Sequence, residues 1–150
     1  MLKLSILEFF LIVIPESFIF TIGIYFLSKK NFSKKRLIIM ALLFAIESYC
    51  VRLLPIHFGI HLAINIIFVI VLSVNIGKIS MKDAISYNMI MMIILSTSEF
   101  INIFLFTKVF NINESLVRLT PAIKVIYVIP YLILFVFNIF LINKFMNKMK

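Results

Sequence analysis

Five apolar runs, separated by short polar stretches, make up most of this chain. They cover residues 4–27, 37–51, 58–77, 84–106 and 121–143. The second run extends to Ile56 if Arg52 is tolerated inside a helix. Runs of about 20 apolar residues match an α-helix that crosses a hydrocarbon core of about 30 Å. The pattern therefore predicts an all-α, polytopic membrane protein with about five transmembrane helices.

The composition supports that class. Hydrophobic residues make up 63% of the 150 positions and charged residues only 14%, too few to cover a water-facing surface. No internal repeat or low-complexity linker interrupts the chain, so we expect residues 1–150 to form a single membrane domain. The net charge of +9 does not imply nucleic acid, because the cations sit in short loops where they meet lipid headgroups. The lipid bilayer is the expected partner.

Lysine and arginine are distributed unequally between the two sides that five spans would define. One side collects Lys29, Lys30, Lys34, Lys35, Arg36, Lys78, Lys82, Lys144, Lys148 and Lys150. The other side collects Lys3, Arg52, Lys108, Arg118 and Lys124. In membrane proteins the cytoplasmic loops generally carry an excess of lysine and arginine. This predicts an amino terminus outside, a carboxyl terminus in the cytoplasm, and insertion in a bacterial cytoplasmic membrane.

Ionisable side chains within or beside the apolar runs are the candidate functional residues, because charge at membrane depth is costly. Under the predicted topology six of them converge on the outer side: Glu8, Glu47, Arg52, His57, His61 and Glu99. We interpret them as a ligand-binding cluster. The competing interpretation is purely structural. The basic side chains would extend to the lipid headgroups, and single glutamates would make contacts that only hold helices together. Glu47 and Arg52 would not pair directly on an ideal helix, so we expect Arg52 to pair across helices with Glu8 or Glu99.

The sequence gives weak support to two further chemistries, metal binding and thiol catalysis. His57 and His61 share a helical face with Asn65, a spacing that can hold a transition metal with Glu47 or Glu99. No His-Glu-x-x-His motif is present, so we expect no metal site. Cys50 lies seven residues before His57, but no orienting group marks a thiol nucleophile, and a cysteine in an apolar helix is usually packing. We therefore expect no catalytic residue, no cofactor and no enzymatic activity.

Polar stripes on the last two runs predict contacts between helices. Ser96–Glu99 and Asn102 form one stripe, and Tyr127, Tyr131 and Asn138 share a face of the final run. We expect interhelical hydrogen bonds from both.

The segment Val51–His61, "VRLLPIHFGIH", resembles part of the multi-pass membrane sensor regions of clostridial GHKL-type sensor histidine kinases. The shared pattern is Arg-Leu-Leu-Pro-x-x-Phe-Gly-x-His, and the early Pro15-Glu16 pair is also similar. The resemblance implies an extracytoplasmic or intramembrane sensing module that a kinase normally follows. These 150 residues contain no phosphoacceptor helix and no ATP-binding domain, so we expect a stand-alone relative or an isolated membrane domain.

The leading expectation is a membrane sensory or regulatory module that binds a ligand or partner near the outer leaflet and signals to the cytoplasmic side. A second copy of the chain, or another membrane or cytoplasmic signalling protein, would be its partner. The alternative is a small transporter or a membrane subunit of a transport complex. An intramembrane peptide-processing enzyme that uses Cys50 is less favoured, and a purely structural partner of a larger complex remains open.

Overall fold

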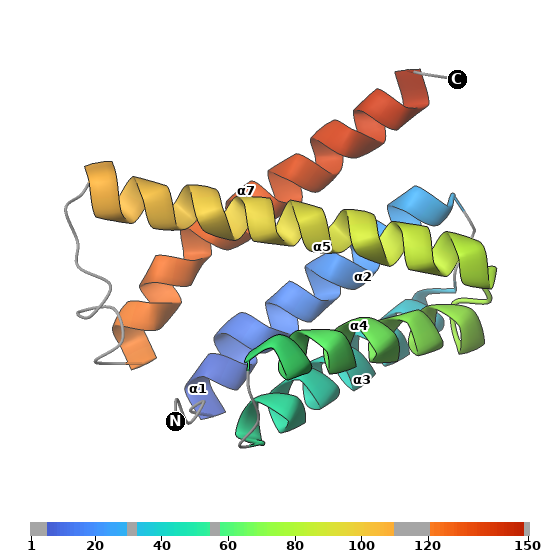
Figure 1. The fold of residues 1–150 in the computed structure, drawn as a ribbon, viewed down its shortest axis with the longest axis horizontal. Coiled ribbons are helices and arrows are strands. Elements are labelled where there is room, and N and C mark those ends of the chain that lie inside the picture. Colours follow the sequence, from blue (N-terminus) through green and yellow to red (C-terminus); the bar gives the residue numbers. More distant parts are fainter. Residues whose placement is uncertain (1–5, 30–32, 55–57, 110–120, 149–150) are drawn as a thin grey trace. The chain divides into compact units, whose positions relative to one another are not determined.

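The computed structural model describes residues 6–29, 33–54, 58–109 and 121–148, without the side chains of 58–59, 109, 121–124 and 145–148. Every regular element in these ranges is a helix (Figure 1). The elements are α1 (Ile6–Glu8), the π-helix η1 (Phe9–Val13), α2 (Ile14–Ser28), α3 (Lys34–Leu53), α4 (Phe58–Asn75), α5 (Met81–Phe104), the π-helix η2 (Leu105–Val109) and α7 (Pro121–Lys148). The all-α prediction is confirmed.

The helix boundaries lie within a few residues of the apolar runs. The largest differences are at polar ends, which hydrophobicity alone does not mark. α3 begins at Lys34 because the Ser33 hydroxyl accepts a hydrogen bond from the Arg36 N–H at 3.4 Å, a serine N-cap. α3 continues to Leu53, so Arg52 lies inside its last turn. The open question of whether the second helix ends before or after Arg52 is thereby answered.

Three helical segments are long and apolar enough to cross a membrane: Ile6–Ser28, Met81–Lys108 and Val125–Lys144. α3 and α4 do not reach that standard. α3 carries Arg36, Glu47 and Arg52 along its length, and the apolar part of α4 is the shorter segment Ile60–Asn75. The number of five spans and their orientation stay predictions.

The first helix is interrupted by a wide turn just before Pro15. The Ile14 N–H bonds to the Phe9 carbonyl five residues back, which makes Phe9–Val13 a π-helix. Proline lacks an N–H and its ring crowds the carbonyl four residues earlier, here that of Leu11. A π-turn is a usual way to accommodate such a disturbance and is frequent at functional sites.

By its internal contacts the chain divides into two compact units, Met1–Ile90 and Met91–Lys150. In the first unit, α2 packs on α3, and each of the two helices buries small side chains. The buried small residues are Ser17, Thr21 and Gly23 on α2, and Ala41, Ala45 and Ser48 on α3. Small residues let two helix backbones approach closely. The hydroxyls of Ser17 and Thr21 donate to carbonyls of their own helix at 2.8 Å, so they add no unpaired polar group to this interface.

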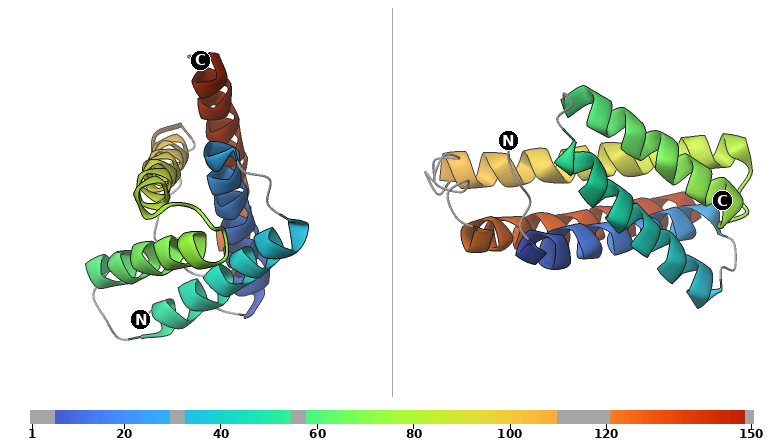
Figure 2. Two further views of the ribbon diagram at one scale, coloured as in Figure 1. Left: turned by 90° about the vertical axis from the view of Figure 1, so that its right-hand side faces the viewer. Right: turned by 90° about the horizontal axis from the view of Figure 1, so that it is seen from below.

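Aromatic contacts fix the other neighbours of α3. The Phe20 ring on α2 packs on Phe44, with centroids 5.3 Å apart. The Phe9 ring on η1 packs edge-on against Tyr49 at 4.9 Å, which brings the start of the first helix beside the last turns of α3. α4 runs back antiparallel beside α3 (Figures 1 and 2). The start of the first helix, the end of α3 and the start of α4 therefore lie at one end of this unit.

The opposite end of the first unit contains the turn from α4 to α5. Ser80 caps α5, because its hydroxyl accepts from the Asp83 N–H at 3.3 Å and donates to Asp83 Oδ2 at 2.7 Å. Farther along α5, the buried Asn88 amide donates to the Ala84 carbonyl at 2.7 Å and to Ser73 Oγ on α4 at 3.4 Å. The turn is thus held by polar contacts at a point where basic residues, Lys78 and Lys82, are exposed.

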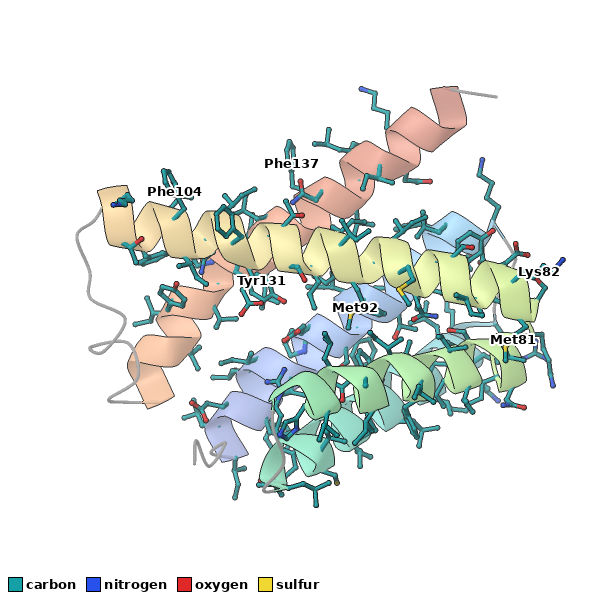
Figure 3. All side chains as sticks on the ribbon, viewed as in Figure 1. Met81, Lys82, Met92, Phe104, Tyr131 and Phe137 are labelled. Carbon is teal, nitrogen blue, oxygen red and sulfur yellow. The ribbon has the colours of Figure 1, made fainter. Side chains whose placement is uncertain are left out.

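In the second unit two hydrogen bonds connect α5 and α7. Asn138 Nδ2 donates to Ser98 Oγ at 2.9 Å, and Asn102 Nδ2 donates to the Tyr127 carbonyl at 3.1 Å. These pairs run in opposite directions along the two helices, so the helices are antiparallel. Large apolar side chains such as Phe104 and Phe137 project outward from this unit (Figure 3). Interhelical hydrogen bonds are therefore confirmed for Ser98, Asn102 and Asn138, whereas Ser96 and Glu99 of the first stripe are exposed.

Candidate functional site: a polar cluster between α3 and α4

The candidate site lies at the end of the first unit where α3 finishes and α4 begins. Glu47 sits six residues before the end of α3, about 9 Å along the axis from it at 1.5 Å per residue. Ser48, beside it, is buried, and Ala45 is completely buried against α2. Glu47 itself is half-buried, nearly two helical turns from the end of α3.

Asn65 of α4 reaches the Glu47 carboxyl group. With its side-chain nitrogen turned towards the acceptors, Asn65 donates to Glu47 Oε1 at 3.1 Å and to the His61 carbonyl at 3.2 Å. In the opposite orientation the side-chain oxygen of Asn65 would face these two acceptor oxygens without a hydrogen bond. The orientation that places the nitrogen there is therefore the favourable one. The bond to His61, one turn earlier on the same helix, holds the Asn65 amide in place for the contact with α3.

The second carboxyl oxygen of Glu47 is differently placed. Oε2 is buried and accepts no hydrogen bond from any residue that the structure describes. A buried acceptor without a donor costs free energy, and a charged one costs more. The two oxygens of one carboxyl group therefore have unequal surroundings, one satisfied by Asn65 and the other enclosed without a donor.

Arg52 supplies positive charge near this carboxyl group. Its guanidinium interacts electrostatically with Glu47, five residues earlier on the same helix. Arg52 itself is exposed, as expected for a long basic side chain whose charged end reaches towards a more polar region. We define the Glu47 cluster as Glu47, Arg52, His61 and Asn65.

Glu8 lies at the same end of the unit. Its side chain is only 2% exposed, in the short turn that precedes the π-helix. The next residue, Phe9, packs on Tyr49, two positions after Glu47 in α3. The first unit thus brings Glu8, Glu47, Arg52 and His61 to one end.

The remaining predicted site residues are placed as follows. His57 lies outside the described residues. Glu99 is exposed on α5 and belongs to the second unit, which is described separately from the first. The predicted pairing of Arg52 with Glu8 or Glu99 therefore stays a prediction. The assignment of all six residues to ligand binding also stays a prediction.

Cysteine and metal chemistry have little structural support among the described residues. Cys50 is exposed on α3, whereas the sequence suggested a packed side chain. Within the described part of the chain, no three histidine, cysteine, aspartate or glutamate side chains gather in a geometry that could hold a metal ion.

Sequence reasoning named Asn65 as part of a histidine stripe but did not include it in the candidate site. Its signal was the four-residue spacing from His61, which places both on one helical face. The buried Asn88 was missed altogether, because a lone asparagine in an apolar run has no distinguishing spacing. The buried small residues Ala41, Ala45 and Ser48 on α3 were not predicted as packing positions either.

Comparison with protein-family models, curated proteins and solved structures finds no match for this chain.

Proposed function

We propose that this chain is a sensory or regulatory module of a bacterial cytoplasmic membrane. The observation that carries the proposal is the contact of Asn65 with Glu47, which ties α4 to α3 through a carboxyl group with one oxygen unsatisfied by the described residues. A contact that served stability alone would be expected to satisfy both oxygens. Ionisable groups within membrane proteins are costly and usually functional.

In this proposal all five long helices cross the membrane, with the amino terminus outside and the carboxyl terminus in the cytoplasm. α3 has 20 residues, a length of about 30 Å at 1.5 Å per residue, and α4 runs beside it. The exposed basic residues at the far end of this unit, Lys34, Lys35, Arg36, Lys78 and Lys82, support a cytoplasmic location for that end. The Glu47 cluster would then face the outer leaflet.

The signal would pass along the hairpin as a change in the pairing of α3 with α4. Such a change needs two arrangements that differ in free energy by a few kcal/mol, and a ligand that prefers one of them. The resemblance of Val51–His61 to sensor regions of clostridial GHKL-type kinases supports the same class of function. A second copy of the chain or a cytoplasmic signalling protein would receive the change.

Substitution in intact cells tests this function. The cellular response is defined as the set of transcripts whose levels change when the gene is deleted. Complementation with the wild-type chain should restore these levels. We expect Arg52→Ala and His61→Ala to accumulate in the membrane at wild-type levels yet fail to restore the response. Cys50→Ser, an exposed change on the same helix, is the matched control and should complement. Normal responses from both cluster variants would refute the proposal.

A small transporter, or a membrane subunit of a transport complex, is the second candidate. The buried Glu8 beside a π-helical turn favours it, because interrupted helices with a buried ionisable group form ion and substrate sites in carriers. Proteoliposomes loaded with a pH-sensitive dye discriminate the two candidates. Proton flux that requires Glu8 would support transport. Absence of proton flux, together with a chain that restores the response in cells, would support sensing.

A further inference from the structure

The packing of α3 on α4 in this structure favours a neutral Glu47 side chain over a charged one. Oε2 is enclosed, and no described residue donates to it. A negative charge on this buried oxygen would be left without a hydrogen-bond donor. A protonated carboxyl group removes that charge, while Oε1 still accepts the Asn65 amide at 3.1 Å.

The charged and titratable neighbours of Glu47 come from each helix packed beside it. On α3 itself these are Arg52, which interacts with Glu47 electrostatically, Tyr49 and Cys50. The first helix contributes the buried Glu8 at the same end, and Glu16 one helical segment farther along. α4 contributes His61, whose carbonyl holds Asn65 in place. Only Arg52 brings a permanent positive charge, and it lies towards the end of the hairpin.

We propose that Glu47 is a proton-binding residue and that its protonation state selects between two pairings of α3 with α4. This inference rests on the sensory function proposed above and names the proton as the ligand. A proton from water on the same side forms an O–H bond at Glu47 Oε2 and returns to water on release; no other bond changes. Loss of the proton leaves a carboxylate that the apolar contact cannot hold, and the group shifts towards Arg52 and water.

Infrared difference spectroscopy of the full chain in lipid vesicles tests proton binding. Acidification should produce the carbonyl stretch of a protonated carboxyl group, and Glu47→Gln should remove a component of that band. Glu99→Gln, a matched change at an exposed glutamate, should leave the component intact. An unchanged band in Glu47→Gln would overturn the inference. It would mean that another acid, such as Glu8, is the residue that titrates. Circular dichroism establishes that both variants are folded.

A distance measurement tests the switch. Cys50 is the chain's single cysteine and is exposed on α3, and Leu62 is exposed on α4. Spin labels on Cys50 and on Leu62→Cys report the separation of the two helices. We expect the distance distribution to shift to longer values as the pH rises in the wild-type background and to stay at its acidic form in Glu47→Gln. A distribution that does not change with pH overturns the switch.

These outcomes separate the proton inference from the function on which it rests. If Arg52→Ala abolishes the cellular response but no band titrates at Glu47, the sensory function stands and its ligand is not the proton. If Glu47 titrates and the helices separate, yet Arg52→Ala and His61→Ala cells respond normally, the proton site stands and the sensory function fails.

Discussion

Asn65 Nδ2 lies 3.1 Å from Glu47 Oε1, and this hydrogen bond joins the two helices of the α3–α4 hairpin. The contact pairs a neutral amide with a carboxyl group, and both residues are half-buried. Changes at Asn65 are therefore expected to affect the stability of the hairpin.

Replacement of Asn65 by leucine should destabilise the hairpin. The change removes the donor to Glu47 and leaves both carboxyl oxygens without a donor from α4. An interhelical hydrogen bond in a membrane protein contributes about 0.6 kcal/mol, and an orphaned buried acceptor adds to that, so we expect a loss of about 1–2 kcal/mol. Unfolding in mixed detergent measures it. Asn75→Leu is the control, because Asn75 is exposed and bonds only the Val71 carbonyl of its own helix; equal losses in both variants would contradict the pairing.

The Ser98–Asn138 hydrogen bond should appear as a coupling between α5 and α7. In a double-mutant cycle with Ser98→Ala and Asn138→Leu, we expect a coupling energy of about 0.6 kcal/mol, the average for such pairs in membranes. The same cycle with Ser96→Ala should give no coupling, since Ser96 is exposed on α5. Strictly additive effects of Ser98→Ala and Asn138→Leu would show that the bond contributes nothing.

Enlargement of Ala45 should disrupt the packing of α2 on α3. Ala45 is completely buried, so a leucine there forces the backbones apart or strains neighbouring side chains. Overpacking of this kind costs about 1–3 kcal/mol. Thermal aggregation in detergent should therefore begin at a lower temperature for Ala45→Leu than for the wild type. Leu42→Ala, at an exposed position of the same helix, should lower the aggregation temperature far less. A larger decrease for Leu42→Ala than for Ala45→Leu would contradict the packing of the Ala45 face.

Removal of the Ser80 cap should weaken the start of α5. Ser80→Ala loses the acceptor for the Asp83 N–H and the donor to Asp83 Oδ2. Loss of a serine N-cap costs about 1 kcal/mol. Amide hydrogen exchange of the first turn of α5 should speed up accordingly. Ser86→Ala serves for comparison, because its exposed hydroxyl bonds only the Lys82 carbonyl. Unchanged exchange in Ser80→Ala would mean that the cap is dispensable.

Chemical labelling checks the proposed orientation. In a Cys50→Ser background, Lys82→Cys places a single thiol at the exposed start of α5 (Figure 3). A membrane-impermeant maleimide should label it only after the cells are opened, because the proposed topology puts this turn in the cytoplasm. Labelling in intact cells would reverse the orientation and would move the Glu47 cluster to the cytoplasmic side.

Much of the fold follows from local properties of the chain. The apolar runs predicted all five long helices, because a helix in an apolar setting must satisfy its backbone internally whatever surrounds it. Pro15 marked a disturbance in the first helix, although the sequence did not indicate that a π-turn would absorb it. The polar stripes of Ser98, Asn102 and Asn138 also predicted their contacts, since residues on one face of each helix have few other partners.

The sequence by itself determined the helices, their approximate ends and the residues whose charge or polarity is costly in an apolar setting. Only the tertiary structure decided which of those residues meet. Asn65 faces Glu47 because α4 folds back on α3 in one register, and Arg52 lies inside α3 because the helix continues past it. Small residues at Ala41, Ala45 and Ser48 could be recognised as an interface only once α2 was seen against them. Helical periodicity fixes the face on which a side chain lies, whereas the partner of that face depends on contacts between distant segments.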